Sequence, residues 1–381
     1  MHKSFKKLTA LMMALMLTLA VLSGCSKTEN TEKTETATKT ETTAEQPKTK
    51  EITDMAGRKV TIPTEVEKVY ATSPIGQVAV YTLNYQKLVG LLFNLTDLEK
   101  KYTPEDYHSL PVLGGWFGKD NKGNVEEILK ADPDVIISMG TLADSDKQFA
   151  DDLQNQMGIP VVMVDGDLEK TAEGYEFLGD VIDEKDRAKE LADYCEKTIG
   201  DAKKIAEGIK EEDKVTVYYA QGPEGLQTDP AQSTHAGVFD FVGAKNIADV
   251  EMKTGYGRTE VSIEQVLNWN PDKIIVCKEK NNQTGGVSSS YEKIMTDSAW
   301  SSLKAVQEKQ VYEIPDSPYN VLDRPPSVSR ILGIKWLGNL LYPDKFKYDI
   351  KEETKEFYKL FYNYELKDGD IEEILSNAVA K

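Results

Sequence analysis

Small polar, aromatic and basic residues gather in loops that follow the apolar segments of this chain. The N-terminal half places Ser73, Trp116 and Thr141 in such loops, and the C-terminal half adds Gln227, Thr228, His235, Tyr256, Arg258, Tyr319 and Arg324. Arginine and protonated histidine pair with carboxylates and oxyanions. Trp116 and Tyr256 have glycines close by, so each can offer an aromatic face to a flat or apolar ligand. These residue types indicate a binding site for a small polar molecule.

Motifs of the common catalytic and nucleotide sites are absent from the sequence. It has no HExxH, GxSxG, GxxxxGK[ST] or GxGxxG pattern, which are the signatures of zinc peptidases, serine hydrolases and nucleotide-binding enzymes. His108 and His235 form no evident metal-ligand cluster with carboxylates, and Cys195 and Cys277 lie in apolar stretches typical of buried thiols. We therefore expect a binding protein rather than an enzyme, with no catalytic residue, cofactor or protein-bound metal. An extracytoplasmic α/β enzyme remains the alternative from another class.

Apolar segments and amphipathic segments alternate from residue 51 onward. The pattern predicts strands at 59–62, 68–73, 87–92, 134–139, 160–164, 214–220, 273–277 and 310–314. It predicts helices at 75–83, 124–131, 144–157, 171–182, 237–242, 262–269, 290–306 and 327–341. Strands separated by helices indicate parallel βαβ units and therefore an α/β fold.

One segment occurs twice in the chain. NVEEILKADPDVIISM at 124–139 aligns without gaps to SIEQVLNWNPDKIIVC at 262–277, and each copy reads as a helix, a proline turn and a buried strand. A repeat across more than a hundred residues indicates two lobes of similar build. Between the copies, residues 187–210 keep an apolar stripe at helical spacing, which predicts a connecting helix about 36 Å long at 1.5 Å per residue. An ordinary surface helix of one lobe is the alternative for this segment.

The N-terminus predicts the compartment. Three lysines precede an apolar run of about 14 residues that is too short to span a bilayer, and LSGC then resembles the cleavage box of a bacterial lipoprotein with Cys25 as the lipidated residue. Residues 1–24 are the expected signal peptide and 25–50 a disordered tether rich in Thr, Glu and Lys. Removing the signal takes the net charge from −18 to −21, which argues against a nucleic-acid partner. We expect a lipid-anchored protein on the extracytoplasmic face of the cell membrane.

The segments ITDMAGRKVTIP, KVYATSP, NVEEILKADPDVII, YYAQGPEGLQTDPAQSTHAGVFDFVGAKNIA, VSIEQVLNWNPDKIIV and DRPPSVSRILGIKWLGNLLYP occur in this order. In order and spacing they resemble the substrate-binding lipoproteins of ABC importers for iron siderophores, haem and cobalamin, over nearly all of 51–345. The resemblance implies the class III periplasmic-binding-protein fold: two Rossmann-like lobes joined by a single long α-helix, with the ligand in the cleft between them. It gives lobes at 51–186 and 211–381, the second with a helical tail, joined by the helix at 187–210.

The same resemblance implies partners for the chain. In the family, a surface glutamate near the start of each repeated helix docks onto arginines of the membrane permease, and the matching positions are Glu126 and Glu264. A structural role at the helix start, without docking, is the alternative for both. The expected partners are a small-molecule ligand, an ABC permease with its ATPase, and the membrane through the lipid anchor, with the protein itself a monomer.

The resemblance implies a ranked set of ligand classes. A ferric siderophore or another metal chelate ranks first, cobalamin or haem second, and an oxyanion such as molybdate or tungstate third. Relatives with the same frame bind bare oxyanions, and His235, Arg258 and Arg324 suit one, but a charge of −21 disfavours long-range steering of anions. An adhesin or sensor lipoprotein with this fold and no permease is a further alternative.

Overall fold

The computed structural model describes residues 48–118, 121–252, 258–281 and 286–380. The expected signal peptide, Cys25 and all but the last three residues of the expected tether lie outside this part of the chain. The folded unit opens with an antiparallel hairpin of β1 (Thr49–Thr53) and β2 (Lys59–Pro63). Thr49 and Lys50, placed in the tether from sequence, already belong to β1, because they pair with Pro63 and Ile62.

The first parallel sheet consists of β3 (Val69–Ala71), β4 (Val135–Gly140) and β5 (Val161–Asp165), in that order. Alternate residues point to opposite faces of each strand, so one face packs on α1 (Pro74–Asn84) and α6 (Thr171–Ile182). The other face packs on α4 (Val125–Ala131) and α5 (Asp144–Met157). Helices on both faces explain why the strands are apolar throughout.

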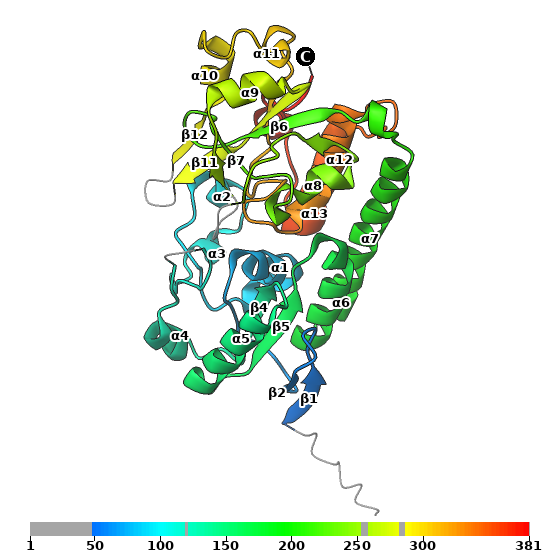
Figure 1. The fold of residues 1–381 in the computed structure, drawn as a ribbon. Coiled ribbons are helices and arrows are strands. Elements are labelled where there is room, and N and C mark those ends of the chain that lie inside the picture. Colours follow the sequence, from blue (N-terminus) through cyan, green and yellow to red (C-terminus); the bar gives the residue numbers. More distant parts are fainter. Residues whose placement is uncertain (1–47, 119–120, 253–257, 282–285, 381) are drawn as a thin grey trace, which may run out of the picture. The chain divides into compact units, whose positions relative to one another are not determined.

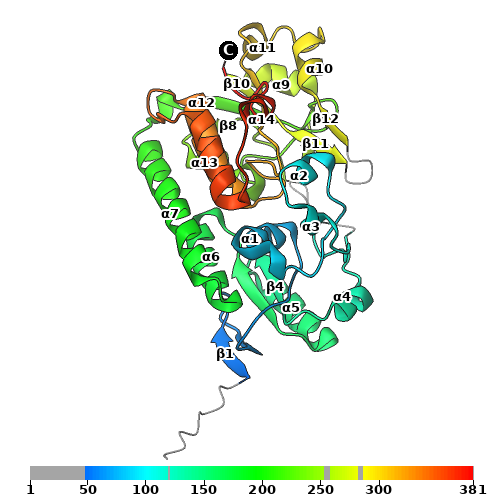
Figure 2. The same cartoon turned by 180° about the vertical axis from the view of Figure 1, so that it is seen from behind.

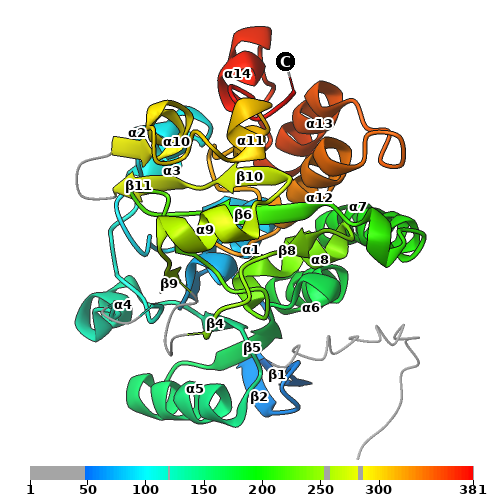
Figure 3. The same ribbon diagram turned by 45° about the horizontal axis from the view of Figure 1, so that its top comes forward.

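The second parallel sheet has the order β13-β10-β6-β8, with β6 (Thr216–Ala220), β8 (Lys245–Asn246), β10 (Lys273–Val276) and β13 (Val311–Glu313). One face is covered by α9 (Ile263–Trp269), α10 (Tyr291–Thr296) and α11 (Lys304–Gln307). The opposite face packs on α8 (Gly237–Phe241) and α12 (Ser329–Leu341), as Figure 3 shows from above this sheet. Two short antiparallel pairs flank it: β7 (Gln227–Thr228) with β9 (Thr259–Glu260), and β11 (Lys278–Asn281) with β12 (Gly286–Ser289).

The sequence repeat corresponds to the same substructure in each sheet. In both copies a seven-residue helix, α4 or α9, ends in a left-handed residue and leads into a central strand, β4 or β10. The repeated aspartate has the same role in both. Asp134 accepts the backbone N–H of Lys68 just before β3, and Asp272 accepts that of Thr216 at the start of β6, at 2.8 and 2.9 Å. In each copy the aspartate thus links its own strand to the start of the neighbouring strand by a hydrogen bond.

A single long helix, α7 (Lys185–Glu207), connects the two parts. It starts two residues before the expected position and ends three residues before it, and its buried stripe includes Leu191, Cys195 and Ala202. It packs on α6 beside the first sheet and on α8 and α12 beside the second, along one side of the molecule in Figure 1. The two-lobed α/β architecture predicted from sequence is therefore observed, with α7 as its connecting strut.

The C-terminal helices form a second bridge between the lobes. Helix α13 (Ile350–Tyr362) contacts both α12 and α1, as Figure 2 shows from behind. Helix α14 (Asp368–Ile374) is linked to α2 (Asp97–Lys101) by two ion pairs. Lys101 Nζ lies 3.0 Å from Asp370 Oδ1 and 2.6 Å from Glu373 Oε2. The tail therefore packs against the N-terminal lobe as well as its own.

Two expected elements are wrong. Residues 87–92 form no strand, because Gln77 Oε1 accepts the Leu92 N–H at 2.9 Å and only isolated bridges join this segment to its neighbours. The expected helix at 290–306 is broken into α10 and α11. Between them the chain turns at Asp297, whose carboxylate accepts the N–H of Ala299, and buries Trp300 in the core.

The remaining elements are short. They are α3 (Glu105–His108), η1 (Tyr85–Lys87), η2 (Leu168–Lys170), η3 (Glu211–Asp213) and η4 (Thr234–Ala236). Within the described part of the chain, no helix has both the length and the hydropathy needed to cross a bilayer.

Gly333 of α12 provides a test of the fold. A Cβ there would lie 1.9 Å from the Val321 carbonyl oxygen, so Gly333→Ala forces apart α12 and the loop at 315–328, and we expect a loss of about 3 kcal/mol in the free energy of unfolding. The matched control is Gly200→Ala in α7, where a Cβ meets nothing within 4 Å and should stabilise by ~0.5–1 kcal/mol. Urea unfolding of both variants measures the difference; equal stabilities would contradict the packing described.

Candidate functional site

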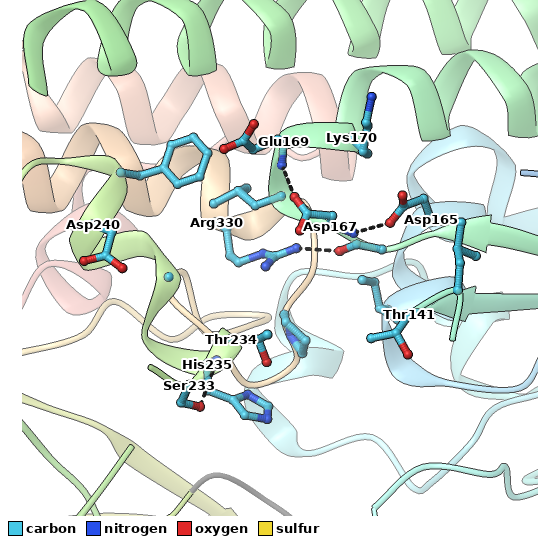
Figure 4. Close-up of a pocket in the computed structure, with 18 of the residues that line it drawn as sticks. Thr141, Asp165, Asp167, Glu169, Lys170, Ser233, Thr234, His235, Asp240 and Arg330 are labelled. Atoms are coloured by element: carbon cyan, nitrogen blue, oxygen red, sulfur yellow. Dashed lines mark hydrogen bonds between the residues drawn. The ribbon is translucent and has the colours of Figure 1, made fainter. Parts of the chain in front are cut away.

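The loops at the carboxyl ends of both sheets face one another across a cleft. Parallel α/β sheets bind ligands at this edge. The cleft contains two cavities that share Ile75, His235 and Pro326. We call the first, of about 800 Å³, the polar cavity; its polar lining includes Thr141, Asp165, Asp167, Glu169, Lys170, Ser233, Thr234, His235, Asp240 and Arg330 (Figure 4). The second, of about 490 Å³, is the aromatic cavity, and its lining includes Ser73, Phe93, Glu99, Phe117, Lys278, Glu279, Lys280, Asp316 and Arg324.

Arg330 is the buried cation of the polar cavity. It lies in the first turn of α12, is 8% exposed, and reaches across the cleft to donate from Nη2 to the Gly166 carbonyl at 3.0 Å (Figure 4). Its Nε donates to the Ser327 carbonyl at 3.4 Å. Among the described residues no carboxylate lies within ion-pair distance of it. Burial lowers the pKa of the guanidinium to about 10, although Asp323 and Asp167 act in the opposite direction.

Three of the four acidic residues that line the polar cavity, Asp165, Asp167 and Glu169, have partners in their own loop or in α7. Asp165 Oδ1 accepts the N–H of Asp167 at 3.0 Å, and Asp167 Oδ1 accepts the N–H of Glu169 at 2.8 Å (Figure 4). Glu169 pairs with Lys203 of α7 at 2.6 Å. The other cation of the lining, Lys170, pairs with Glu173 at 2.8 Å. Among the described residues of this cavity, Arg330 is therefore the cation with unused N–H groups.

Arg324, in contrast, is neutralised by two buried acids. Its Nη2 lies 2.8 Å from Asp229 Oδ2 and its Nε 3.1 Å from Asp323 Oδ2. Burial alone would lower the pKa of Arg324, but Asp323, with Tyr219 and Asp229, raises it overall. Asp229 also accepts from Gln221 Nε2 at 2.5 Å. Arg324 lines the aromatic cavity, but its charge is already balanced.

His235 lies where the two cavities meet. It belongs to η4, between the Ser233 cap and α8, and its Nδ1 is hydrogen-bonded to Asp323 Oδ1. The Asp323 side chain is 1% exposed, whereas that of His235 is 26% exposed. A buried carboxylate thus fixes the orientation of a ring that remains accessible from the cleft.

The aromatic cavity combines two phenylalanines with a buried lysine. Phe93 and Phe117 meet edge to face with their centroids 6.1 Å apart. Lys280 Nζ lies 2.8 Å from Asp316 Oδ1 and 3.9 Å from Glu99 Oε1, so it joins the C-terminal lobe to α2 of the N-terminal lobe. Burial by itself lowers the pKa of Lys280, and the two carboxylates outweigh it and raise the pKa.

The structure brings four of the ten predicted ligand-binding residues to the cavities. They are Ser73, whose hydroxyl donates to the Met139 carbonyl at 2.8 Å, Thr141, His235 and Arg324. The Thr141 hydroxyl donates to Asp146 in the first turn of α5. Ser73 and Thr141 come directly after β3 and β4, whereas His235 and Arg324 lie in the longer connections that follow β7 and β13. Tyr256 lies outside the described residues.

The other five predicted residues do not line either cavity. The Trp116 ring packs on Tyr70 and Phe149, with centroids 6.4 and 5.8 Å away, so the neighbouring Phe117 faces the cavity instead. Gln227 and Thr228 form β7. Arg258 pairs with Glu279 at 3.0 Å, and the buried Tyr319 packs on Tyr362. Their polar groups belong to the scaffold around the cleft.

Arg330 and Asp323 are the residues that sequence reasoning missed. A signal for Arg330 exists in the sequence, since the segment SRILGIKWLGNLL places only two charges in an otherwise apolar helix. Every charge in a buried helix needs a partner or a function. Lys335, the other one, pairs with Glu353 at 2.5 Å. Asp323 has no comparable local signal, because its role depends on a residue 88 positions away.

Glu126 and Glu264 occupy matching positions. Each is the second residue of its helix, α4 or α9, and each is exposed. The pKa of Glu264 is lowered by its own backbone N–H at the helix start and by the Ser262 side chain. Nothing in the described part of the chain groups three or more His, Cys, Asp or Glu side chains in an arrangement that holds a metal ion.

Comparison with known proteins gives consistent results. Residues 94–318 match the model of a family described as periplasmic binding protein. A curated relative, the molybdate-binding protein MolA of Haemophilus influenzae, is 27% identical over 340 residues, covering 82% of this chain and 90% of the relative. The Fe(3+)-citrate-binding protein YfmC of Bacillus subtilis is 24% identical over 312 residues, covering 81% and 89%.

A solved structure extends this similarity to the fold. The ABC transporter solute binding protein from Sulfurospirillum deleyianum is 31% identical, with a TM-score of 0.77, covering 85% of this chain and 98% of that one. These findings confirm the predicted resemblance and the two-lobed α/β fold. The chain belongs to the periplasmic binding protein family.

Proposed function

We propose that this protein is the solute-binding lipoprotein of an ABC import system, and that it captures a small anionic metal chelate in the cleft and delivers it to the permease. It is anchored through Cys25 on the extracytoplasmic face of the membrane, and the tether that follows ends before β1 begins at Thr49. The two lobes, which α7 joins, enclose the ligand. The protein acts as a monomer without a cofactor of its own, and the cargo is the transported solute.

The observation that carries this proposal is Arg330. A buried guanidinium without a carboxylate partner among the described residues is costly, because burial removes its hydration without replacing it. An anionic group in the polar cavity offsets this desolvation penalty by pairing with the unused N–H groups of Arg330. Arginine is suited to this role, since its planar fork matches carboxylates and oxyanions bidentately.

Size and lining favour a chelate over a bare ion. Cavities of about 300–1,000 Å³ are typical of sites for drug-sized ligands, and the polar cavity alone is about 800 Å³. The adjoining aromatic cavity offers Phe93 and Phe117 to an organic scaffold. The relative named for Fe(3+)-citrate supports an anionic ferric chelate as the first candidate.

Molybdate or a related oxyanion is the second candidate. The relative named for molybdate is the more similar of the two curated relatives, at 27% identity. Arg330 could pair with a tetrahedral oxyanion as well as with a carboxylate. Such an ion fills only a small part of the polar cavity, so this alternative requires water or a closer approach of the lobes.

A ligand panel tests the proposed function. Thermal unfolding and calorimetry with ferric citrate, a ferric catecholate siderophore, haem, cobalamin and molybdate should show stabilisation by an anionic ferric chelate. A ligand at 100 times its Kd stabilises by about 2.7 kcal/mol. Stabilisation by molybdate alone would transfer the assignment to the oxyanion, and silence of the whole panel would contradict both.

Arg330 and Arg324 should respond oppositely to loss of charge. Arg330→Met removes an uncompensated buried cation, so we expect unchanged or higher stability together with at least a hundredfold loss of affinity for the anionic ligand. Arg324→Met leaves Asp229 and Asp323 buried without their counter-ion and should cost about 3 kcal/mol of stability. Urea unfolding and calorimetry on both variants measure this; a destabilised Arg330→Met that still binds would contradict the assignment.

We further propose that Glu126 and Glu264 dock the permease, one for each half of a two-fold symmetric partner. Both are exposed at the start of equivalent helices, which supports this role. The Glu126→Lys, Glu264→Lys double variant should bind the ligand normally and lose most uptake in cells that depend on this importer. The control variant Glu127→Lys, Gln265→Lys changes the adjacent positions; equal uptake by both double variants would refute docking.

A further inference from the structure

The two nitrogens of the His235 ring have different environments. Nδ1 is hydrogen-bonded to Asp323 Oδ1, whereas Nε2 has no hydrogen-bond partner among the residues that the structure describes. His235 lines both cavities, so a ligand that extends from one cavity to the other passes this ring. A neutral imidazole has one donor nitrogen and one acceptor nitrogen. Which of them carries the proton decides what the cleft offers to the ligand.

Asp323 determines that choice. Its side chain is buried, and its second oxygen, Oδ2, faces Arg324 Nε at 3.1 Å. A carboxylate beside a guanidinium is ionised and can only accept hydrogen bonds. Nδ1 must therefore be the protonated nitrogen, and the lone pair of Nε2 is left for the cleft. The same arrangement, a histidine that donates its second N–H to a carboxylate, is common where the other nitrogen binds a metal.

We propose that Asp323 is a positioning residue that selects the Nδ1–H tautomer of the neutral imidazole of His235, so that this form presents an unprotonated Nε2 to the cleft together with the unpaired N–H groups of Arg330. This inference rests on the proposed function, in which the cleft holds a solute. It specifies the class of solute: one that carries an anionic group for Arg330 and also a lone-pair acceptor for His235.

A metal chelate with an exchangeable position and free carboxylates meets both requirements. The Nε2 lone pair forms a bond to the metal and a water ligand leaves, while a carboxylate pairs with Arg330. A chelate or organic solute with an N–H or O–H group can instead donate a hydrogen bond to Nε2. A fully ionised tetrahedral oxyanion has acceptor atoms only, so it matches Arg330 and is repelled by the Nε2 lone pair.

The network predicts an unusual effect of Asp323→Asn. The positive guanidinium of Arg324, whose Nε lies 3.1 Å from Oδ2 of Asp323, attracts the amide oxygen of the new side chain, and the NH₂ group then turns toward His235. The NH₂ group then donates to Nδ1, which moves the imidazole proton to Nε2. The substitution thus converts the group facing the cleft from an acceptor into a donor while changing few atoms.

Nitrogen-15 NMR of histidine-labelled protein at pH 8 measures the tautomer directly. The chain has three histidines, and the spectrum of His235→Gln assigns the resonances of His235. We expect the Nδ1–H tautomer in the natural protein and the Nε2–H tautomer in Asp323→Asn. Asp229→Asn is the matched control, since it removes a buried charge from the same arginine without touching His235, and its tautomer should be unchanged.

Binding then tests the consequence for the solute. Calorimetry with ferric citrate should show at least a tenfold loss of affinity in Asp323→Asn, and molybdate should bind that variant no more weakly than the natural protein. The NMR result needs no ligand, so it stands apart from the proposed function: an Nε2–H tautomer in the natural protein overturns this inference even if ferric citrate binds. Failure of ferric citrate to bind, with the Nδ1–H tautomer present, counts instead against the proposed chelate.

Discussion

The cleft depends on one apolar core that passes behind it. The two parallel sheets share no backbone hydrogen bond, yet Val69 and Ile137 of the first belong to the same buried cluster as Val217 and Ile275 of the second. Helices α7 and α13 connect these surfaces, and tyrosines from both lobes pack edge to face within the cluster, such as Tyr102 with Tyr358. Separating the lobes would expose this core to water, at about 25 cal/mol per Å² of apolar surface. The width of the cleft is thus set by packing behind it.

Two cations of the C-terminal lobe contact the N-terminal lobe across the cleft. Arg330 reaches from α12 to the Gly166 carbonyl of the opposite lobe, and Lys280 reaches from β11 toward Glu99 of α2. These two cations differ in their surroundings: Lys280 faces two carboxylates, whereas Arg330 faces carbonyl oxygens. The same contrast separates Arg324 from Arg330 within a few residues of chain. The candidate ligand site is thus marked by the charge that is left unbalanced in the described cleft, more than by the number of charged residues there.

Sequence periodicity predicted most of the scaffold. The helices at 144–157 and 171–182 agree with the structure to the residue, because both carry a regular apolar stripe and end at a left-handed residue, Gly158 or Asp183. The strand expected at 87–92 was wrong because an apolar run shows that a segment is buried without showing how its backbone is paired. Here the Gln77 side chain accepts the Leu92 N–H, and only isolated bridges form. The single helix expected at 290–306 was wrong because the chain turns at Asp297 and Trp300 is buried in the core. Local periodicity predicts neither contact, because the first joins Gln77 to a residue 15 positions away and the second depends on a single turn at Asp297.

The sequence by itself determined the α/β class, the repeated helix–strand units and the connecting helix, because these follow from local periodicity and from the family pattern. Only the tertiary structure decided which polar residues act. Trp116 and Tyr319 became packing residues, whereas Arg330, within an apolar helix, became the cation of the polar cavity. The physical reason is that the availability of a charge or a lone pair depends on its partners, and partners such as Asp323 for His235 are brought together by folding over long sequence distances.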